Sequence, residues 1–94
     1  MDVISFSREM SISHADFLRT LSAAEELGPF QIDGDLIQIN GSRITIRLLP
    51  EGERHIASLR LPQTTVEFRF EGCDAAEVER FMERFQRYFQ RGGG

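Results

Sequence analysis

Residues 74–94, DAAEVERFMERFQRYFQRGGG, decide the fold predicted for this chain. At helical spacing their apolar side chains fall on a single stripe, made up of Val78, Phe81, Met82, Phe85, Tyr88 and Phe89. Asp74 stands at the N-cap position, Glu77 completes a capping box three residues later, and Gly92 follows the last turn. The pattern predicts a C-terminal amphipathic helix that packs its apolar stripe on a core.

The N-terminal part of the chain predicts one strand followed by one helix. Residues 3–12 alternate between apolar and polar side chains, which is typical of a strand with one solvated face. Ser13 is placed to cap a helix that ends before Gly28 and Pro29. From Phe30 to Gly72 the residue types favour strands.

Turn signals divide this second region. Residues 30–40 are expected to form one strand, with Asp33, Gly34 and Asp35 making a bulge or tight turn within it. Asn40 and Gly41 predict a two-residue hairpin turn that places Ile37 opposite Ile44. Further strands are expected at residues 44–48, 57–61 and 65–71, separated by turns at 50–53 and 62–63. Their core-facing side chains are expected to be Ile44, Ile46 and Leu48, then Ala57, Leu59 and Leu61, and then Val66, Phe68 and Phe70.

These elements follow the order β-α-β-β-β-β-α. Because each helix has one apolar stripe and each strand one apolar parity, we expect an α+β fold: a single antiparallel meander sheet with two helices on one face. The order of elements resembles one repeat of the TATA-box-binding-protein-like fold, a curved sheet backed by two helices. It is more distantly similar to short helix-grip folds, which hold small molecules between the sheet and a long helix. By analogy, the resemblance implies DNA binding or ligand binding.

The composition predicts one domain. A chain of 94 residues supports a single core, so we expect one α+β domain over residues 1–91, and a flexible glycine tail at 92–94. All 11 basic side chains are arginine, and 15 acidic ones bring the formal net charge to -4, which argues against a generic DNA-binding protein. No apolar run of signal-peptide or membrane-span length is present, so we expect a cytoplasmic protein with no membrane association.

The residue types that carry catalysis or bind metals are not arranged as a site. His14 and His55 are far apart in the sequence, and each is interpreted as a structural residue. Cys73 is the only cysteine, and we interpret it as a small buried side chain rather than a nucleophile. Asp33 and Asp35 lack the further oxygen ligands of a calcium loop. We therefore expect no enzyme activity, no cofactor and no metal.

The outward-facing positions of the predicted sheet combine arginines with scattered apolar side chains. Under the predicted parity this face carries Arg43, Arg47, Arg60 and Arg69, with Leu36, Leu49 and Ile56 among them. Arginines on an open sheet face suit an acidic protein, a small anion or a nucleic-acid backbone. Alternatively, cross-strand pairs of arginine with glutamate or threonine simply solvate the face. The face has no aromatic side chain on which bases could stack.

The favoured hypothesis is a small, non-enzymatic binding module. Its expected partner is another protein or a second copy of the chain, bound through the open sheet face. The alternative is binding of an anionic ligand or a nucleic acid by the arginines of that face, although the acidic net charge makes nucleic acid the less favoured partner. The arginines of the last helix, Arg80, Arg84 and Arg87, are a third candidate surface, but a solvated face with pairs such as Glu83 to Arg87 is the favoured explanation for them.

Overall fold

The structure is a computed structural model, and it describes residues 3–41 and 43–91; the expected glycine tail at 92–94 lies outside the described residues. Its elements are β1 (Val3–Met10), α1 (His14–Ala23), the 3-10 turn η1 (Glu25–Leu27), β2 (Phe30–Asp33), β3 (Leu36–Ile39), β4 (Ile44–Leu48), β5 (Gly52–Ile56), β6 (Leu59–Glu71) and α2 (Ala75–Arg91). No helix in the described part of the chain is both long and apolar enough to cross a bilayer.

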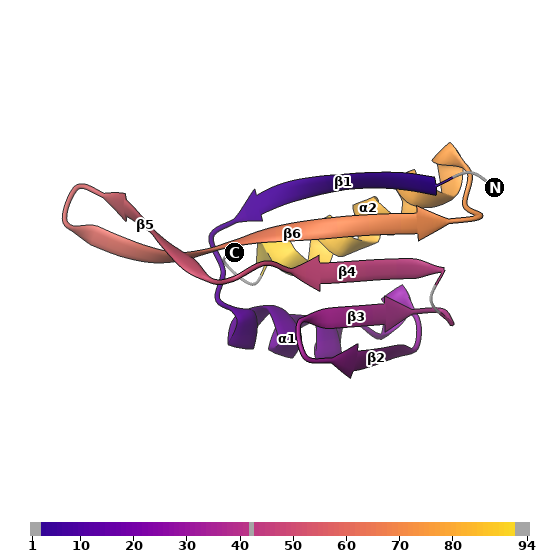
Figure 1. Ribbon diagram of the computed structural model, residues 1–94, viewed down its shortest axis with the longest axis horizontal. Helices are drawn as coiled ribbons and strands as arrows, with labels where there is room; N and C mark the ends of the chain where they lie inside the picture. Colours follow the sequence, from indigo (N-terminus) through magenta and orange to yellow (C-terminus); the bar gives the residue numbers. More distant parts are fainter. Residues whose placement is uncertain (1–2, 42, 92–94) are drawn as a thin grey trace.

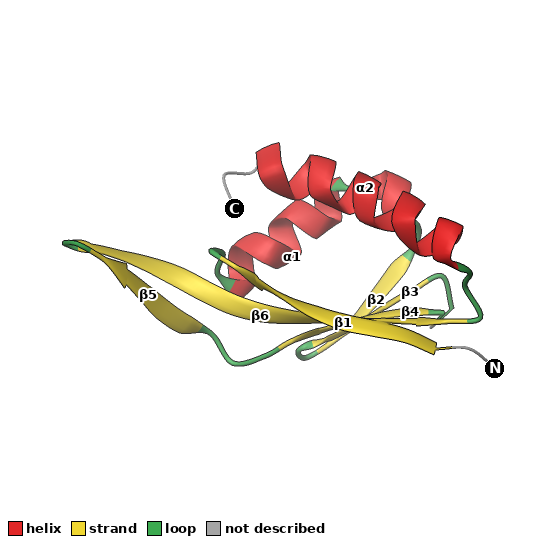
Figure 2. Cartoon of the chain, turned by 90° about the horizontal axis from the view of Figure 1, so that it is seen from above, coloured by secondary structure: helices red, strands yellow, loops and turns green. Residues whose placement is uncertain are grey.

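The strands form an antiparallel sheet in the spatial order β1-β6-β4-β3-β2. Both α1 and α2 lie across the same side of this sheet, as Figure 2 shows. The opposite side, which we call the open face, carries no described helix. The predicted α+β class, with an antiparallel sheet and two helices on one face, is confirmed.

The longest strand, β6, organises the molecule. Its residues 64–71 pair with β1 on one side, and residues 66–70 pair with β4 on the other. Its first five residues pair only with β5, and this hairpin, residues 52–63, is called the arm. The arm extends beyond the sheet (Figure 1), and the molecule measures 46 × 25 × 24 Å along its principal axes.

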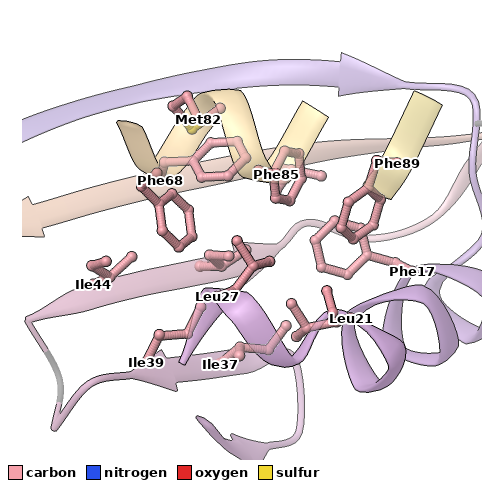
Figure 3. Close-up of a cluster of buried hydrophobic side chains, with 14 of the residues drawn as sticks. Phe17, Leu21, Leu27, Ile37, Ile39, Ile44, Phe68, Met82, Phe85 and Phe89 are labelled. Atoms are coloured by element: carbon pink, nitrogen blue, oxygen red, sulfur yellow. The ribbon is translucent and has the colours of Figure 1, made fainter. Parts of the chain in front are cut away.

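The core lies between the sheet and the two helices and is rich in phenylalanine (Figure 3). Phe85 of α2 stands at its centre, with its ring centroid 4.1 Å from that of Phe89 and 5.0 Å from that of Phe68 on β6. Phe17 of α1 reaches the same cluster through Phe89, at 4.7 Å. The predicted apolar stripe is confirmed: Phe81, Met82, Phe85 and Phe89 are buried, and Val78 and Tyr88 pack against them.

Both predicted helix caps are present. The amide of Glu77 donates to Asp74 Oδ1 at 2.8 Å, and the amide of Asp74 donates in return to Glu77 Oε1 at 3.3 Å, which completes the capping box of α2. Ser13 caps α1 by accepting a hydrogen bond from the amide of Asp16 at 3.1 Å. These caps depend only on neighbouring residues, which is why the local sequence predicts them.

Residues 30–40 do not form one strand. They fold into the β2–β3 hairpin, in which Asp33 lies opposite Leu36 and the turn is made by Gly34 and Asp35. Gly34 has a φ of +64°, a conformation that glycine adopts without steric cost. Of the two alternatives considered for Asp33, Gly34 and Asp35, the structure therefore contains the tight turn, and it adds an edge strand to the sheet.

The predicted register of the next hairpin is wrong by two residues. Ile39, not Ile37, lies opposite Ile44, and Ile37 lies opposite Ile46. The connection spans residues 40–43, of which residue 42 is outside the described residues, and the amide of Arg43 bonds to Asn40 O at 3.4 Å. A shift of two residues preserves the face of every side chain. The predicted core positions on β3 and β4 are therefore still buried.

The predicted strand at residues 57–61 and the predicted break at Pro62 are also wrong. Ala57 and Ser58 form a turn, and β6 runs from Leu59 through Pro62 without interruption. At Pro62 the strand has a single described neighbour, β5, so the missing amide proton is tolerated as it is in an edge strand. Tertiary position, and not residue type, decides whether this proline ends a strand.

Candidate functional site

The arm has two chemically different sides. Residues that lie directly opposite each other in an antiparallel pair point to the same side. Ile56 lies opposite Leu59, and Arg54 opposite Leu61, so one side is mainly apolar. The alternating pairs, His55 with Arg60 and Glu53 with Pro62, form the polar side. We call these the apolar side and the polar side of the arm.

The apolar side of the arm is open to solvent. Leu59 is 61% exposed and Ile56 is 46% exposed, and every residue of β5 is exposed. None of these side chains belongs to the buried core or packs against it. A hairpin of two strands is only marginally stable in water. Exposed leucine and isoleucine on such an element therefore do not follow from the folding of this chain alone.

Two hydrogen bonds to His14 hold the base of the arm against α1. The amide of His14 donates to Glu51 Oε1 at 2.8 Å, which places a carboxylate at the helix N-terminus, where the helix dipole favours it. Nε2 of His14 donates to Leu49 O at 2.7 Å. The structural interpretation of His14 is thus supported by its contacts.

A buried threonine fixes β6 where the arm leaves the sheet. Thr64 is fully buried, and its hydroxyl donates to Ile12 O at 2.7 Å, joining β6 to the connection between β1 and α1. On the opposite side of β6, the amide of Leu49 donates to Thr65 O at 3.0 Å. The arm therefore starts from a base that is hydrogen-bonded on both sides of β6, whereas nothing described covers its tip.

The apolar side of the arm is continuous with the open face. Side chains alternate along a strand, so Leu59 and Leu61 lie on the same side of β6 as Thr65, Glu67 and Arg69. A shallow depression of about 280 Å³ lies on the open face at β3, β4 and β6, lined by Leu36, Gln38, Thr45, Arg47, Glu67, Arg69 and Glu71. Together these form one surface that runs from the arm across the sheet.

Three of the predicted binding residues meet in this depression. Leu36 lies opposite Arg47 in the register, and Arg47 lies opposite Glu67 on the neighbouring strand. Arg69 Nη2 is 3.0 Å from Glu71 Oε1. Arg47 thus has the cross-strand glutamate considered from the sequence, whereas the glutamate beside Arg69 lies two residues along the same strand. Such exposed pairs contribute about 0.2–1 kcal/mol each.

Arg43 does not lie on the open face. Its Nη2 donates to Gly72 O at 2.7 Å, lies 3.5 Å from Glu77 Oε2 and is 3.7 Å from Cys73 Sγ. Arg43 therefore binds the connection between β6 and α2, on the helix side of the sheet. The prediction fails because the longer turn at residues 40–43 removes Arg43 from β4, where alternation would have pointed it outward.

Arg60, Leu49 and Ile56 also lie away from the depression. Because β6 is continuous from Leu59, Arg60 has the parity of Phe68 rather than that of Arg69, and it stands on the polar side of the arm. Leu49 is half-buried just after β4, and Ile56 is near the tip of the arm. The predicted surface is thus divided among separate places, and Ile56 joins Leu59 and Leu61, which the sequence interpretation had assigned to the core.

One signal could have identified the arm. The residues that precede the turn, Glu53, Arg54 and His55, are consecutive polar side chains, so this strand has no buried side. A strand that is polar on both sides has no face to pack on a core. Its partner in a hairpin is then exposed as well, which would have placed Leu59 and Leu61 on the surface.

A second pocket, of about 320 Å³, lies between the N-terminal half of α2, η1 and the turn before β4. Its charged lining is mixed: Arg43, Arg80, Arg84, Glu26 and Glu77. Cys73 also lines it, but is 8% exposed, and neither histidine takes part. Within residues 3–41 and 43–91, no three His, Cys, Asp or Glu side chains are grouped so that they could hold a metal ion. The pocket therefore places no histidine beside Cys73, and its charged lining exceeds balance by a single arginine.

Half-buried Tyr88 lies on the same helix and faces η1. Its pKa is raised above the ordinary value, first by burial and then by the neighbouring carboxylate of Glu26. A phenol with a raised pKa stays protonated at neutral pH, so Tyr88 acts as an uncharged contact between α2 and η1.

Comparison of the chain with protein-family models, with curated proteins and with solved structures gives no match.

Proposed function

We propose that this chain is a small, non-enzymatic protein-binding module that holds its partner with the apolar side of the arm and the adjoining open face. The single observation that carries the proposal is the exposure of Leu59, at 61%, and Ile56, at 46%, on a hairpin with no core beneath it. Exposed apolar side chains gathered on one element, with polar residues around them, are characteristic of interaction sites.

The residues around the apolar side define the chemistry of the partner. Arg54 stands among Leu59 and Leu61, and Arg47 lies farther along the same surface. An arginine covers apolar area with its stem and pairs with carboxylates through its planar head. The partner is thus expected to present an apolar patch next to carboxylates.

The alternative function, anion or nucleic-acid binding, has less support. It requires the four arginines to converge, but Arg43 and Arg60 lie elsewhere, while Arg47 and Arg69 have glutamates beside them. A relationship to the TATA-box-binding-protein-like fold is likewise only a proposal, supported by an antiparallel sheet with two helices on one side. A reducing, cytoplasmic location is proposed from the unpaired Cys73.

The test compares the two sides of the arm. Proteins captured from the source cell by the wild-type chain are compared with those captured by Ile56→Ser/Leu59→Ser and by the matched control His55→Ser/Arg60→Ser, which changes the polar side of the same strands. We expect a partner that is retained by the wild type and the control and lost by the apolar-side variant. Equal loss in both variants, or no loss in either, would contradict the proposal.

A second measurement separates the alternative. The wild-type chain is titrated with mixed-sequence DNA at several salt concentrations, because binding through phosphates weakens steeply as salt rises. Under the proposal, no salt-dependent binding is expected. Tight binding at low salt that Arg47→Glu abolishes would favour the nucleic-acid function instead.

A further inference from the structure

The two end strands of the sheet differ in how they protect their free edges. At one end, β2 has four residues, begins just after Pro29 and ends at the turn made by Gly34 and Asp35. At the other end, β1 has eight residues and pairs only with β6, so its outer edge has no partner among the described residues. An unpaired edge is a template for another strand, and proteins usually blunt it with short strands, prolines, bulges or charges.

The β1 strand has few of these protections. It contains neither proline nor glycine, and it pairs with β6 one-to-one from Val3 to Met10, without a bulge. Its only charged residues are Arg8 and Glu9, which are adjacent and of opposite sign. The long edge is therefore regular, close to neutral, and suited to pairing with a further strand.

Apolar side chains flank this edge on the helix side. Two shallow depressions follow the junction of β1 with α2, and their lining includes Phe6, Arg8 and Met10 together with Val78, Met82 and Phe85. Phe6 and Met10 are only half-buried, and the guanidinium of Arg8 lies 5.8 Å from the centroid of the Phe6 ring. A strand added at this edge would cover the apolar parts of this lining.

We infer that β1 pairs antiparallel with β1 of a second copy, about a two-fold axis through Ser7. A two-fold axis perpendicular to the sheet places the helices of both copies on the same side of the joined sheet. Residues of equal parity then lie opposite each other, and the amide and carbonyl groups on the two free edges can form hydrogen bonds. With Ser7 at the centre, Phe6 lies opposite Arg8 of the second copy, and Ile4 lies opposite Met10 of the second copy.

This register makes the strand complementary to itself. Arg8 gains the face of a second phenylalanine ring, a cation–π contact of the kind that already exists within the chain. On the open face, the hydroxyl of Ser5 lies opposite the carboxylate of Glu9 of the second copy, and no like charges oppose each other. A register centred on Phe6 would instead place Glu9 opposite Val3 and Arg8 opposite Ile4. The side chains therefore select Ser7 as the centre and a second copy as the occupant.

Edge pairing leaves the arm and the open face uncovered, so this dimer is independent of the proposed partner-binding surface. It extends the sheet sideways and stacks nothing on either face of it. Failure of the dimer and failure of the proposed function are thus distinguishable by separate variants.

A charge swap on β1 tests the pairing and its register. In Ser5→Glu, the new carboxylate faces Arg69 within the chain, which favours folding. In the dimer it faces the carboxylate of Glu9 of the second copy, and the two-fold axis repeats this repulsive contact. We expect reversible dimerisation of the wild type in sedimentation equilibrium, and a dissociation constant raised about tenfold in this variant. In Glu9→Lys alone, the new lysine faces Ser5 of the second copy, so the dissociation constant should change little. In Ser5→Glu/Glu9→Lys, the new glutamate faces the new lysine of the second copy, so the wild-type constant should be restored.

Several results would overturn the inference. These are a wild-type chain that stays monomeric at all concentrations, a dimer that is indifferent to Ser5→Glu, and a swap variant that is not restored. If Ser5→Glu does not fold, Ser7→Lys serves instead: it faces Glu67 within the chain, which favours folding, and the same lysine of the second copy across the axis, so it should weaken the dimer. An unchanged or tighter dimer would also overturn the inference. Loss of the dimer in Ile56→Ser/Leu59→Ser would assign it to the arm and reject β1 pairing.

Discussion

The two halves of β6 contrast a strand that folds the molecule with a strand that only extends from it. Between Val66 and Phe70, alternate side chains are fully buried under α2 and the strand has neighbours on both sides. Between Leu59 and Gln63 it has one described neighbour, and no residue is buried. The same alternation of apolar side chains thus stabilises the fold at one end and remains available to a partner at the other.

The apolar side chains of the two halves point to opposite faces of β6, and only the face that carries Phe68 is covered by the helices. Apolar side chains contribute to stability in proportion to the area that folding removes from water. Phe68 is 1% exposed beneath Phe85, whereas Leu59 is 61% exposed. Stability and binding are therefore expected to separate along this strand.

The largest effect is expected from Phe85→Ala. Its ring contacts Phe68, Phe89 and Phe17, so truncation opens a cavity at the centre of the core. We expect a loss of about 3–5 kcal/mol in the free energy of unfolding, measured by denaturant titration. The exposed Arg87→Ala, on the same helix, is the control and should change it by less than about 0.5 kcal/mol. A Phe85→Ala variant as stable as this control would show that the core does not depend on α2.

Thr64→Val tests the boundary between the two halves. The substitution keeps the shape of the side chain but removes the buried hydroxyl that donates to Ile12 O. We expect a loss of about 1–3 kcal/mol in the free energy of unfolding, because the carbonyl loses its partner in a dry site. Thr64→Ser retains the donor and should be less destabilising. If serine costs more than valine, packing rather than the hydrogen bond dominates at this position.

Ala57→Gly is expected to stabilise the arm alone. Ala57 adopts a φ of +53° in the turn, where an alanine side chain is strained and glycine is not. We expect hydrogen exchange of the arm amides to slow by an amount that corresponds to about 1 kcal/mol, with little change in global unfolding. Faster exchange throughout the arm would mean that the gain in backbone freedom of the unfolded state outweighs the relief of strain.

The smallest effect on stability is expected from Ile56→Ser/Leu59→Ser. Both side chains are exposed and outside the core, so the free energy of unfolding should change by less than about 0.5 kcal/mol, while partner binding is lost. Chemical denaturation beside the capture experiment measures both. A destabilisation as large as that of Thr64→Val would show that the arm is part of the cooperative core and would contradict the separation described above.

The sequence by itself determined the local elements and the sides of the strands that face the core. The capping box of α2, the cap of α1 and the apolar stripe around Phe85 depend on residues within a few positions of one another, so periodicity and residue type predict them. The buried parity of β3 and β4 was also correct, because a register error of two residues leaves every side chain on its own face.

Tertiary structure alone decided which apolar residues stay exposed and where the arginines lie. Leu59 and Leu61 alternate with polar residues as Phe68 and Phe70 do, but in the continuous strand β6 the two leucines point to the open face and the two phenylalanines point to the helices. Arg43 does not lie on the open face because its turn is two residues longer than predicted. Arg60 does not lie there because β6 continues through Pro62, which sets the side to which Arg60 points. The physical reason is the same in each case. Burial depends on which distant parts of the chain pack against a side chain, and a local sequence pattern does not specify those parts.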